Sequence, residues 1–96
     1  MKRLLAVLLL SASAFAHSVT LTWKPVNPLP EHYIVYRATG DEAAEEIAEL
    51  PATSTAFVDR DVSGGGQYCY TVQWVARGQS GYVGKPICVT IPRDKK

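Results

Sequence analysis

The chain has 96 residues, of which 47% are apolar and 9% aromatic, and its formal net charge at pH 7 is +1. This length allows one compact domain and leaves no room for a second hydrophobic core. A net charge near zero without a basic block argues against a nucleic-acid-binding surface, and the aromatic content argues against a disordered chain.

The amino terminus has the three parts of a secretory signal peptide. Two basic residues precede the apolar run of residues 4–10, and the small residues that follow end in Ala-Phe-Ala at residues 14–16, which fits an A-x-A cleavage site. We therefore expect residues 1–16 to be removed during export. The mature chain would then begin at His17 and be secreted, either to the extracellular space or into the periplasm.

The apolar run is too short to span a bilayer. A membrane-spanning helix needs roughly 20 apolar residues, and no later segment is long and apolar enough. We expect no stable membrane span after signal cleavage, one domain over residues 17–92 and a short charged tail over residues 93–96.

Apolar and polar residues alternate from Ser18 onward, which is the pattern of a strand with one buried face. Val19, Leu21 and Trp23 share the apolar face. Residues 24–30 hold three prolines, which cannot donate to a β-ladder, so a connecting loop is predicted there.

Two further strands are predicted before the middle glycines. The second strand covers residues 32–39 and the third covers residues 54–59. One side of the second strand carries Tyr33, Val35 and Arg37. In the third strand Phe57 is the only large side chain, and we expect it to point inward.

Residues 40–50 are compatible with either a helical turn or a strand. The first half has good helix propensity and Asp41 could cap a turn, but the segment is short and Ile47 and Leu50 give a narrow apolar stripe. We favour a turn and a short edge strand over residues 46–50. The five carboxylates here could be taken for a cation site, but such a run is more often a solvated face.

The most regular strand is predicted over residues 68–76. Its partner is predicted over residues 84–91, and residues 77–83, which include two glycines and a serine, form the hairpin loop between them. In the strand over residues 68–76, the tyrosine, valine and tryptophan side chains share one face, and we expect that face to be buried.

The two cysteines are predicted to form a structural disulfide. Residue parity puts Cys69 and Cys88 on the face away from the aromatic residues, and placing them opposite each other centres the hairpin between Gly78 and Gln79. Export to an oxidising compartment favours the bond. A redox pair or a zinc site is the alternative, which the absence of C-x-x-C spacing disfavours, so no metal ion and no cofactor are expected.

No arrangement of residues predicts catalysis. Residues 78–81 lack the spacing of a nucleophile elbow, and the three glycines at residues 64–66 lack the lysine and the helix of a phosphate-binding loop. Asp59 and Asp61 form a pair of carboxylates, for which turn or capping hydrogen bonds are the simpler use. The chain is therefore not expected to be an enzyme.

Three groups of residues together resemble the fibronectin type III domain. They are Leu21-x-Trp23-x-Pro25, Tyr33-x-Val35-Tyr36-Arg37, and Val62-x-Gly64-Gly65-x-x-Tyr68-x-Tyr70-x-Val72. The resemblance covers about residues 18–91 and implies an all-β sandwich of two antiparallel sheets, with Tyr68 as a corner tyrosine whose hydroxyl bonds to the backbone upstream. The expected core residues are Trp23, Tyr33, Val35, Phe57, Val62, Tyr68, Tyr70, Val72 and Trp74.

The sequence departs from this family in three places. Trp74 stands where a small residue is usual, Gly64 stands where a proline is common, and the first strand of the family is missing before residue 18. Without that strand, the segment from Val19 to Trp23 would be an exposed sheet edge, which a partner could complete by adding a strand.

We therefore expect an exported module that binds an unknown protein or a surface polymer, and not nucleic acid. Loops cluster at the two ends of such a sandwich, so residues 24–30 and the hairpin loop are the first candidates, with Arg77, Gln79 and Tyr82 as contacts. Gln79 replaces the aspartate of an integrin-binding Arg-Gly-Asp, so that activity is not expected. The alternatives are a structural subunit completed by strand addition and a small secreted inhibitor.

Overall fold

The structure, a computed structural model of the chain, describes residues 10–15 and 17–93. Most of the predicted signal peptide (residues 1–9 and 16) and most of the predicted tail (residues 94–96) lie outside the described residues. Within the described part all regular elements are strands, and no helix there is long and apolar enough to cross a membrane.

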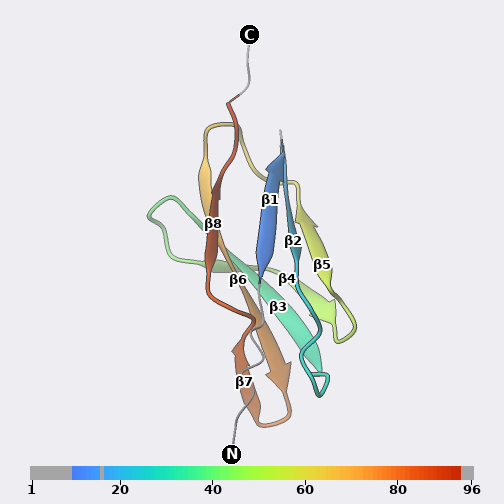
Figure 1. Ribbon diagram of the computed structural model, residues 1–96. Helices are drawn as coiled ribbons and strands as arrows, with labels where there is room; N and C mark the ends of the chain where they lie inside the picture. Colours follow the sequence, from blue (N-terminus) through green and yellow to red (C-terminus); the bar gives the residue numbers. More distant parts are fainter. Residues whose placement is uncertain (1–9, 16, 94–96) are drawn as a thin grey trace, which may run out of the picture.

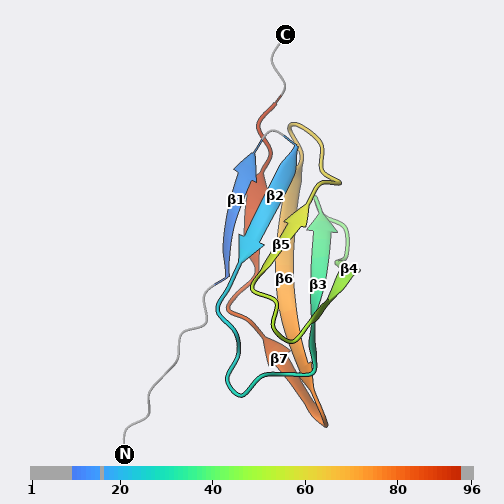
Figure 2. The same cartoon turned by 90° about the vertical axis from the view of Figure 1, so that its right-hand side faces the viewer.

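The described residues form eight strands in two antiparallel sheets (Figures 1 and 2). The strands are β1 (Ser11–Phe15), β2 (Ser18–Thr22), β3 (His32–Thr39), β4 (Glu45–Pro51), β5 (Ala56–Asp59), β6 (Gln67–Ala76), β7 (Gln79–Tyr82) and β8 (Ile87–Thr90). One sheet has the order β1-β2-β5; in the other, β4, β3 and β6 are successive neighbours, and β7 and β8 both pair with β6. This confirms the predicted two-sheet, all-β sandwich.

The core lies between the two sheets, as the alternation in β2, β3 and β6 predicts. The expected core residues that are buried are Trp23, Tyr33, Val35, Val62, Tyr68, Tyr70 and Val72, whereas Phe57 and Trp74 are partly buried and pack against them. The rings of Trp23 and Tyr33 meet edge to face with centroids 5.6 Å apart. The Tyr33 hydroxyl also accepts a hydrogen bond from the Val26 N–H at 3.0 Å, which fixes the β2–β3 loop to the core.

The segment predicted to be either a helical turn or an edge strand is the edge strand β4. It pairs only with β3, and a bulge between Val35 and Tyr36 shifts its register. Its inward residues Ile47, Ala48 and Leu50 pack against the core. Tertiary packing therefore outweighs the helix propensity of the acidic residues.

The prediction that the first strand is missing is wrong for the described chain. Residues of the predicted signal peptide form β1, which pairs with β2 from Ser11 opposite Thr22 to Phe15 opposite Ser18. Leu10 is buried and Ala12 and Ala14 are partly buried against the core. The leader-like composition of residues 4–16 concealed this strand alternation, and the edge of β2 is covered in this structure.

The prediction that residues 77–83 form a hairpin loop is also wrong in part, because they contain β7. Gln73 lies opposite Tyr82 in the β6–β7 pair, whereas Cys69 lies opposite Cys88 in the β6–β8 pair, so the register shifts by two residues between β7 and β8. The tight turn itself is at Gly78, whose φ of 76° favours glycine.

The glycine loop before β6 closes around Tyr68. The Ser63 N–H donates a hydrogen bond to the Tyr68 hydroxyl at 2.9 Å, which is the upstream backbone contact expected of a corner tyrosine. A Cβ at Gly66 would lie 2.8 Å from that hydroxyl oxygen, so only glycine fits there without displacing the ring.

The predicted disulfide between Cys69 and Cys88 is confirmed. Its S–S distance is 2.07 Å, and it joins β6 to β8 on the face of the sheet that points away from the core. The bond fixes the last strand of a domain whose core is small.

Replacing Cys69 and Cys88 together by serine should lower the free energy of unfolding by about 3 kcal/mol, because the unfolded chain is no longer restricted by the closed loop. Urea unfolding of the oxidised protein and the double variant measures this difference. The unchanged protein after reduction of its disulfide is the control, and its free energy of unfolding should fall by a similar amount. Equal midpoints in all three samples would contradict the prediction.

Candidate functional site

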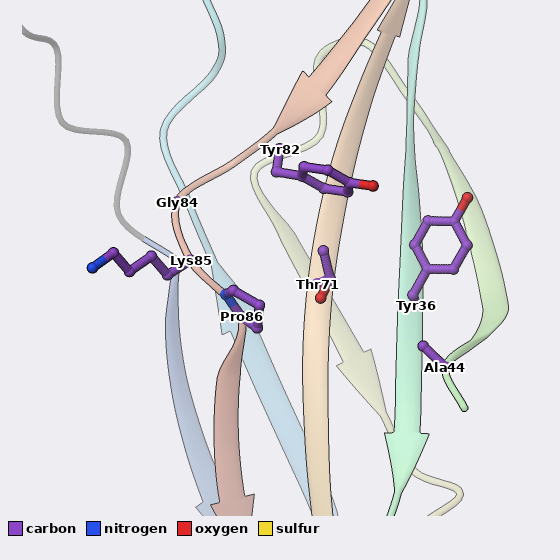
Figure 3. Close-up of a pocket in the computed structure, with 7 residues that line it drawn as sticks. All are labelled: Tyr36, Ala44, Thr71, Tyr82, Gly84, Lys85 and Pro86. Carbon is purple, nitrogen blue, oxygen red and sulfur yellow. The ribbon is translucent and has the colours of Figure 1, made fainter. Parts of the chain in front are cut away.

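An open groove of about 620 Å³ lies on the outer face of the five-stranded sheet (Figure 3). We call it the tyrosine groove, and its lining residues are Tyr36, Ala44, Thr71, Tyr82, Gly84, Lys85 and Pro86. These residues come from β3, the β3–β4 connection, β6, β7 and the β7–β8 connection. The sandwich core is on the opposite side of this sheet.

The groove exists because the last part of the chain leaves the β-ladder between β7 and β8. Val83 is buried and its N–H donates to the Val72 carbonyl at 2.8 Å, which holds the chain against β6. Gly84 then has a φ of 67°, and Pro86 cannot donate a backbone hydrogen bond. The connection therefore bends away from β6 before Ile87 starts β8.

Two tyrosines from different strands face this groove. Tyr36 is partly buried on β3, and its hydroxyl donates to the Gln73 side-chain oxygen at 2.9 Å, which orients the ring. Tyr82 lies opposite Gln73 on β7 and is 60% exposed. Figure 3 shows Thr71 on β6 below the Tyr82 ring and to one side of Tyr36, and the Lys85 side chain extending away from both rings.

The sequence-predicted contact residues are only partly brought together. Tyr82 lines the groove, but on β7 instead of in a loop. Arg77 and Gln79 are exposed at the β6–β7 turn and do not line it. Sequence reasoning missed Tyr36 as a site residue; the alternation of the second predicted strand puts it on the face opposite Tyr33 and Val35, but its proximity to Tyr82 depends on β7, which was predicted as a loop.

The groove lining suits recognition. Its polar groups are phenol and alcohol hydroxyls and one ammonium group, and it contains no carboxylate, imidazole or thiol. No group of three or more possible metal ligands occurs among residues 10–15 and 17–93. Flat aromatic surface with a few polar groups at its ends is typical of ligand sites on rigid scaffolds.

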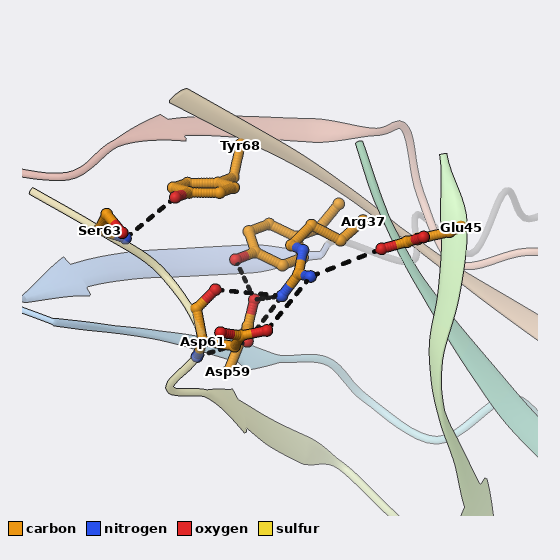
Figure 4. A network of polar contacts seen from close by, with 7 residues as sticks. Arg37, Glu45, Asp59, Asp61, Ser63 and Tyr68 are labelled. Atoms are coloured by element: carbon orange, nitrogen blue, oxygen red, sulfur yellow. Dashed lines mark hydrogen bonds and ion pairs between the residues drawn. The ribbon is translucent and has the colours of Figure 1, made fainter. Parts of the chain in front are cut away.

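Apart from the groove, a cluster of polar side chains is buried between the sheets (Figure 4). The Arg37 Nη1 donates to both carboxylate oxygens of Asp59, at 3.1 and 3.0 Å. Asp59 also accepts from the Tyr70 hydroxyl at 2.6 Å and from the Asp61 N–H at 3.0 Å. Glu45, which is exposed, lies 3.7 Å from the other Arg37 terminal nitrogen.

This cluster joins β5 of one sheet to β3 and β6 of the other. The predicted turn hydrogen bond of Asp59 is present, but the sequence prediction missed its ion pair with Arg37. The signal was available, because Arg37 shares the apolar face of its strand with Tyr33 and Val35. An arginine on a buried face needs an acidic partner.

The hydrogen bonds of the cluster stabilise the ionised form of Asp59. Burial acts to raise the pKa of this carboxyl, but the contacts from Tyr70, the Asp61 N–H and Arg37 outweigh burial and hold it below its usual 3.8. Burial, followed by the contact with Asp59, raises the pKa of Tyr70. The cluster is therefore a charged pair with a neutral phenol, and its role is structural.

Comparison with solved structures identifies the fold. A crystal structure of a fibronectin type III domain of human collagen XX has a TM-score of 0.72 and 20% identity, and the match covers 86% of this chain and 84% of that chain. A solution structure of such a domain of the human collagen α-1(XX) chain has a TM-score of 0.78 and 15% identity, covering 100% and 89%. The chain has the fibronectin type III fold.

A third similar structure is the pectate lyase PelI of Erwinia chrysanthemi in complex with tetragalacturonic acid. Its TM-score is 0.74 and its identity 28%, and the match covers 88% of this chain but only 28% of that chain. The similarity therefore concerns one part of the lyase. No protein-family model and no curated protein sequence matches the chain.

Replacing Asp59 by asparagine should lower the free energy of unfolding by about 3–5 kcal/mol, because Arg37 loses its buried partner and keeps only the exposed carboxylates of Glu45 and Asp61, 3.7 and 3.6 Å from its Nη2. Replacing the exposed Asp61 by asparagine is the matched control and should cost about 1 kcal/mol or less. Urea unfolding at neutral pH measures both. Equal losses in the two variants would contradict the assigned role of Asp59.

The same cluster predicts a loss of stability in acid. The pKa of Asp59 is lower in the folded chain than its usual 3.8. The ionised carboxylate therefore contributes fully to the free energy of unfolding above pH 3.8, and this contribution is lost as the pH falls through the folded pKa. Unfolding midpoints measured from neutral to strongly acidic pH should decline more in the unchanged protein than in the Asp59→Asn variant. If the unfolding midpoints of the two proteins declined in parallel with pH, ionised Asp59 would not be the stabilising group.

Proposed function

We propose that the protein is an exported, non-catalytic binding module that holds an acidic polysaccharide in the tyrosine groove. The observation that carries this proposal is the exposure of Tyr82, which is 60% accessible beside Tyr36 and above Thr71. A large aromatic side chain that is left outside the core on a rigid strand is a favourable anchor for a ligand.

The chemistry of a sugar chain matches the lining. A sugar ring has a flat face of C–H groups, which packs on an aromatic ring, and hydroxyls at its edge, which exchange hydrogen bonds with groups such as the Thr71 hydroxyl. Tyr36 and Tyr82 stand on strands that are both neighbours of β6. Two strand spacings, about 9.6 Å, separate them across the sheet, so an extended polymer can contact both rings.

Charge favours a polymer that carries carboxylates. Lys85 is the only charged residue that lines the groove in the described part of the chain, and its side chain starts at the rim and extends away from the two tyrosine rings (Figure 3). The similar part of pectate lyase PelI belongs to a protein whose structure contains tetragalacturonic acid. Together these observations support a uronic acid polymer as the ligand class.

Several features support a location outside the cytoplasm and a role without catalysis. The disulfide between Cys69 and Cys88 is typical of exported proteins, and the sequence begins with the pattern of a signal peptide. The groove offers no pair of a nucleophile and a base. A module of this kind would bind a polysaccharide without cleaving it.

Binding of polygalacturonate tests the proposal. The unchanged protein should bind polygalacturonate more tightly than a neutral glucan, and the Tyr82→Ala variant should lose about tenfold in affinity, because the ring carries much of the contact area. The Lys85→Gln variant should lose its preference for the acidic polymer. Isothermal titration at two salt concentrations measures both effects.

Matched substitutions outside the groove provide the controls. Leu29, which is 54% exposed in the β2–β3 loop, gives Leu29→Ala as the apolar control, and Arg77→Gln removes a positive charge from the β6–β7 turn. Both should bind like the unchanged protein. An equal effect of Arg77→Gln and Lys85→Gln, or no binding of the acidic polymer, would refute the proposal.

A further inference from the structure

β1 combines two features that conflict in one segment. It is the outer strand of the three-stranded sheet and completes the core, yet it comes from the predicted signal peptide and ends inside the predicted cleavage motif at residues 14–16. Within its sheet it pairs only with β2, and it lies beside β8 where the two sheets meet (Figures 1 and 2).

The side chains of β1 define the space that this strand occupies. Leu10 is buried in the core, Ala12 lies opposite Leu21, and Ala14 lies opposite Val19. Both partners on β2 are fully buried. We call this space the strand slot: it takes one aliphatic side chain followed by two methyl-sized side chains at alternate positions.

The outward side chains of β1 do not contact the core, so they place no restriction on the residues of a segment bound in the slot. Ser11 and Ser13 are exposed and Phe15 is 76% exposed. Whether a segment fits the slot therefore depends on its inward side chains. The backbone hydrogen bonds to β2 can be made by any extended segment.

Removal of residues 1–16 would empty this slot. One edge of β2 would then present N–H and C=O groups without strand partners, and the core beside Val19 and Leu21 would be open on one side. Such an edge is a site for strand addition.

We propose that, after the leader is removed, the strand slot binds an extended segment of a partner protein that runs antiparallel to β2. The bound segment has the pattern aliphatic-x-small-x-small that Leu10, Ala12 and Ala14 show in this structure. This inference rests on the exported state in the proposed function but involves the other sheet.

A second copy of the mature chain is a poorer occupant. The exposed edge strand of that copy would be its own β2, which brings Val19 and Leu21 to the inward positions where alanines fit here. Adding methylene groups to a packed position forces neighbours apart. The slot therefore selects small side chains and disfavours pairing of β2 with β2.

The test uses the chain produced with its natural amino terminus in a secreting host, with the start of the exported product determined by mass spectrometry. The first probe is a synthetic peptide of residues 10–15, Leu-Ser-Ala-Ser-Ala-Phe. It should bind the exported chain and raise its melting temperature in a dose-dependent way. Exported protein that retains residues 10–15 would overturn the proposal.

Two matched peptides test the pattern. Replacing Ala12 and Ala14 by valine enlarges the inward side chains and should abolish binding. Replacing Ser11 and Ser13 by valine changes the outward side chains with the same gain in strand propensity, and should preserve it. Equal binding of both peptides, or a dimer of the exported chain that no peptide dissociates, would contradict a slot that selects small residues.

A second variant keeps the test decisive if the exported chain is poorly folded. A protease recognition sequence inserted between Phe15 and His17 of the full chain allows β1 to fold in place and then to be cut. An excess of labelled peptide of residues 10–15 should then exchange into the slot, and the Ala12, Ala14 valine peptide should not. Absence of exchange overturns the proposal, whereas polygalacturonate binding is measured separately on the same protein.

Discussion

The strict two-residue alternation of β6 is the constraint on which both faces of the molecule depend. Its inward residues include Tyr68, Tyr70 and Val72, and its outward residues include Cys69, Thr71 and Gln73. A shift of one residue would exchange the two faces. The same pairing that buries the tyrosines therefore also places the disulfide, the hydroxyl in the groove and the hydrogen-bond partner of Tyr36 on the outside.

The polar cluster adds a directional requirement to this apolar core. Apolar side chains attract one another without a preferred angle, but Arg37 must meet both oxygens of Asp59, and Tyr70 must meet the same carboxylate. A displacement of one sheet relative to the other would leave two charges buried and unpaired. The relative position of the sheets is thus defined by three side chains from three strands.

Much of the fold could be predicted from local patterns, and the failures have physical causes. The strands over residues 32–39 and 68–76 were predicted almost at their observed bounds, because each alternates over at least eight residues. β1 was missed because small and apolar residues serve equally in a leader and in an edge strand. β7 was missed because glycine and serine weaken its pattern. The tyrosine groove could not be predicted, since it depends on where the chain leaves the ladder, a tertiary property.

The break between β7 and β8 has a consequence for how this surface can vary. The chain is attached to β6 on both sides of the break, by the β6–β7 hairpin and by the Cys69–Cys88 bond. Residues 84–86 are therefore a bridge anchored at both ends, by buried Val83 against β6 and by β8. Insertions or exchanges in this bridge would widen, narrow or recharge the rim while the scaffold stays in place, so ligand preference could diverge between related chains without loss of the sandwich.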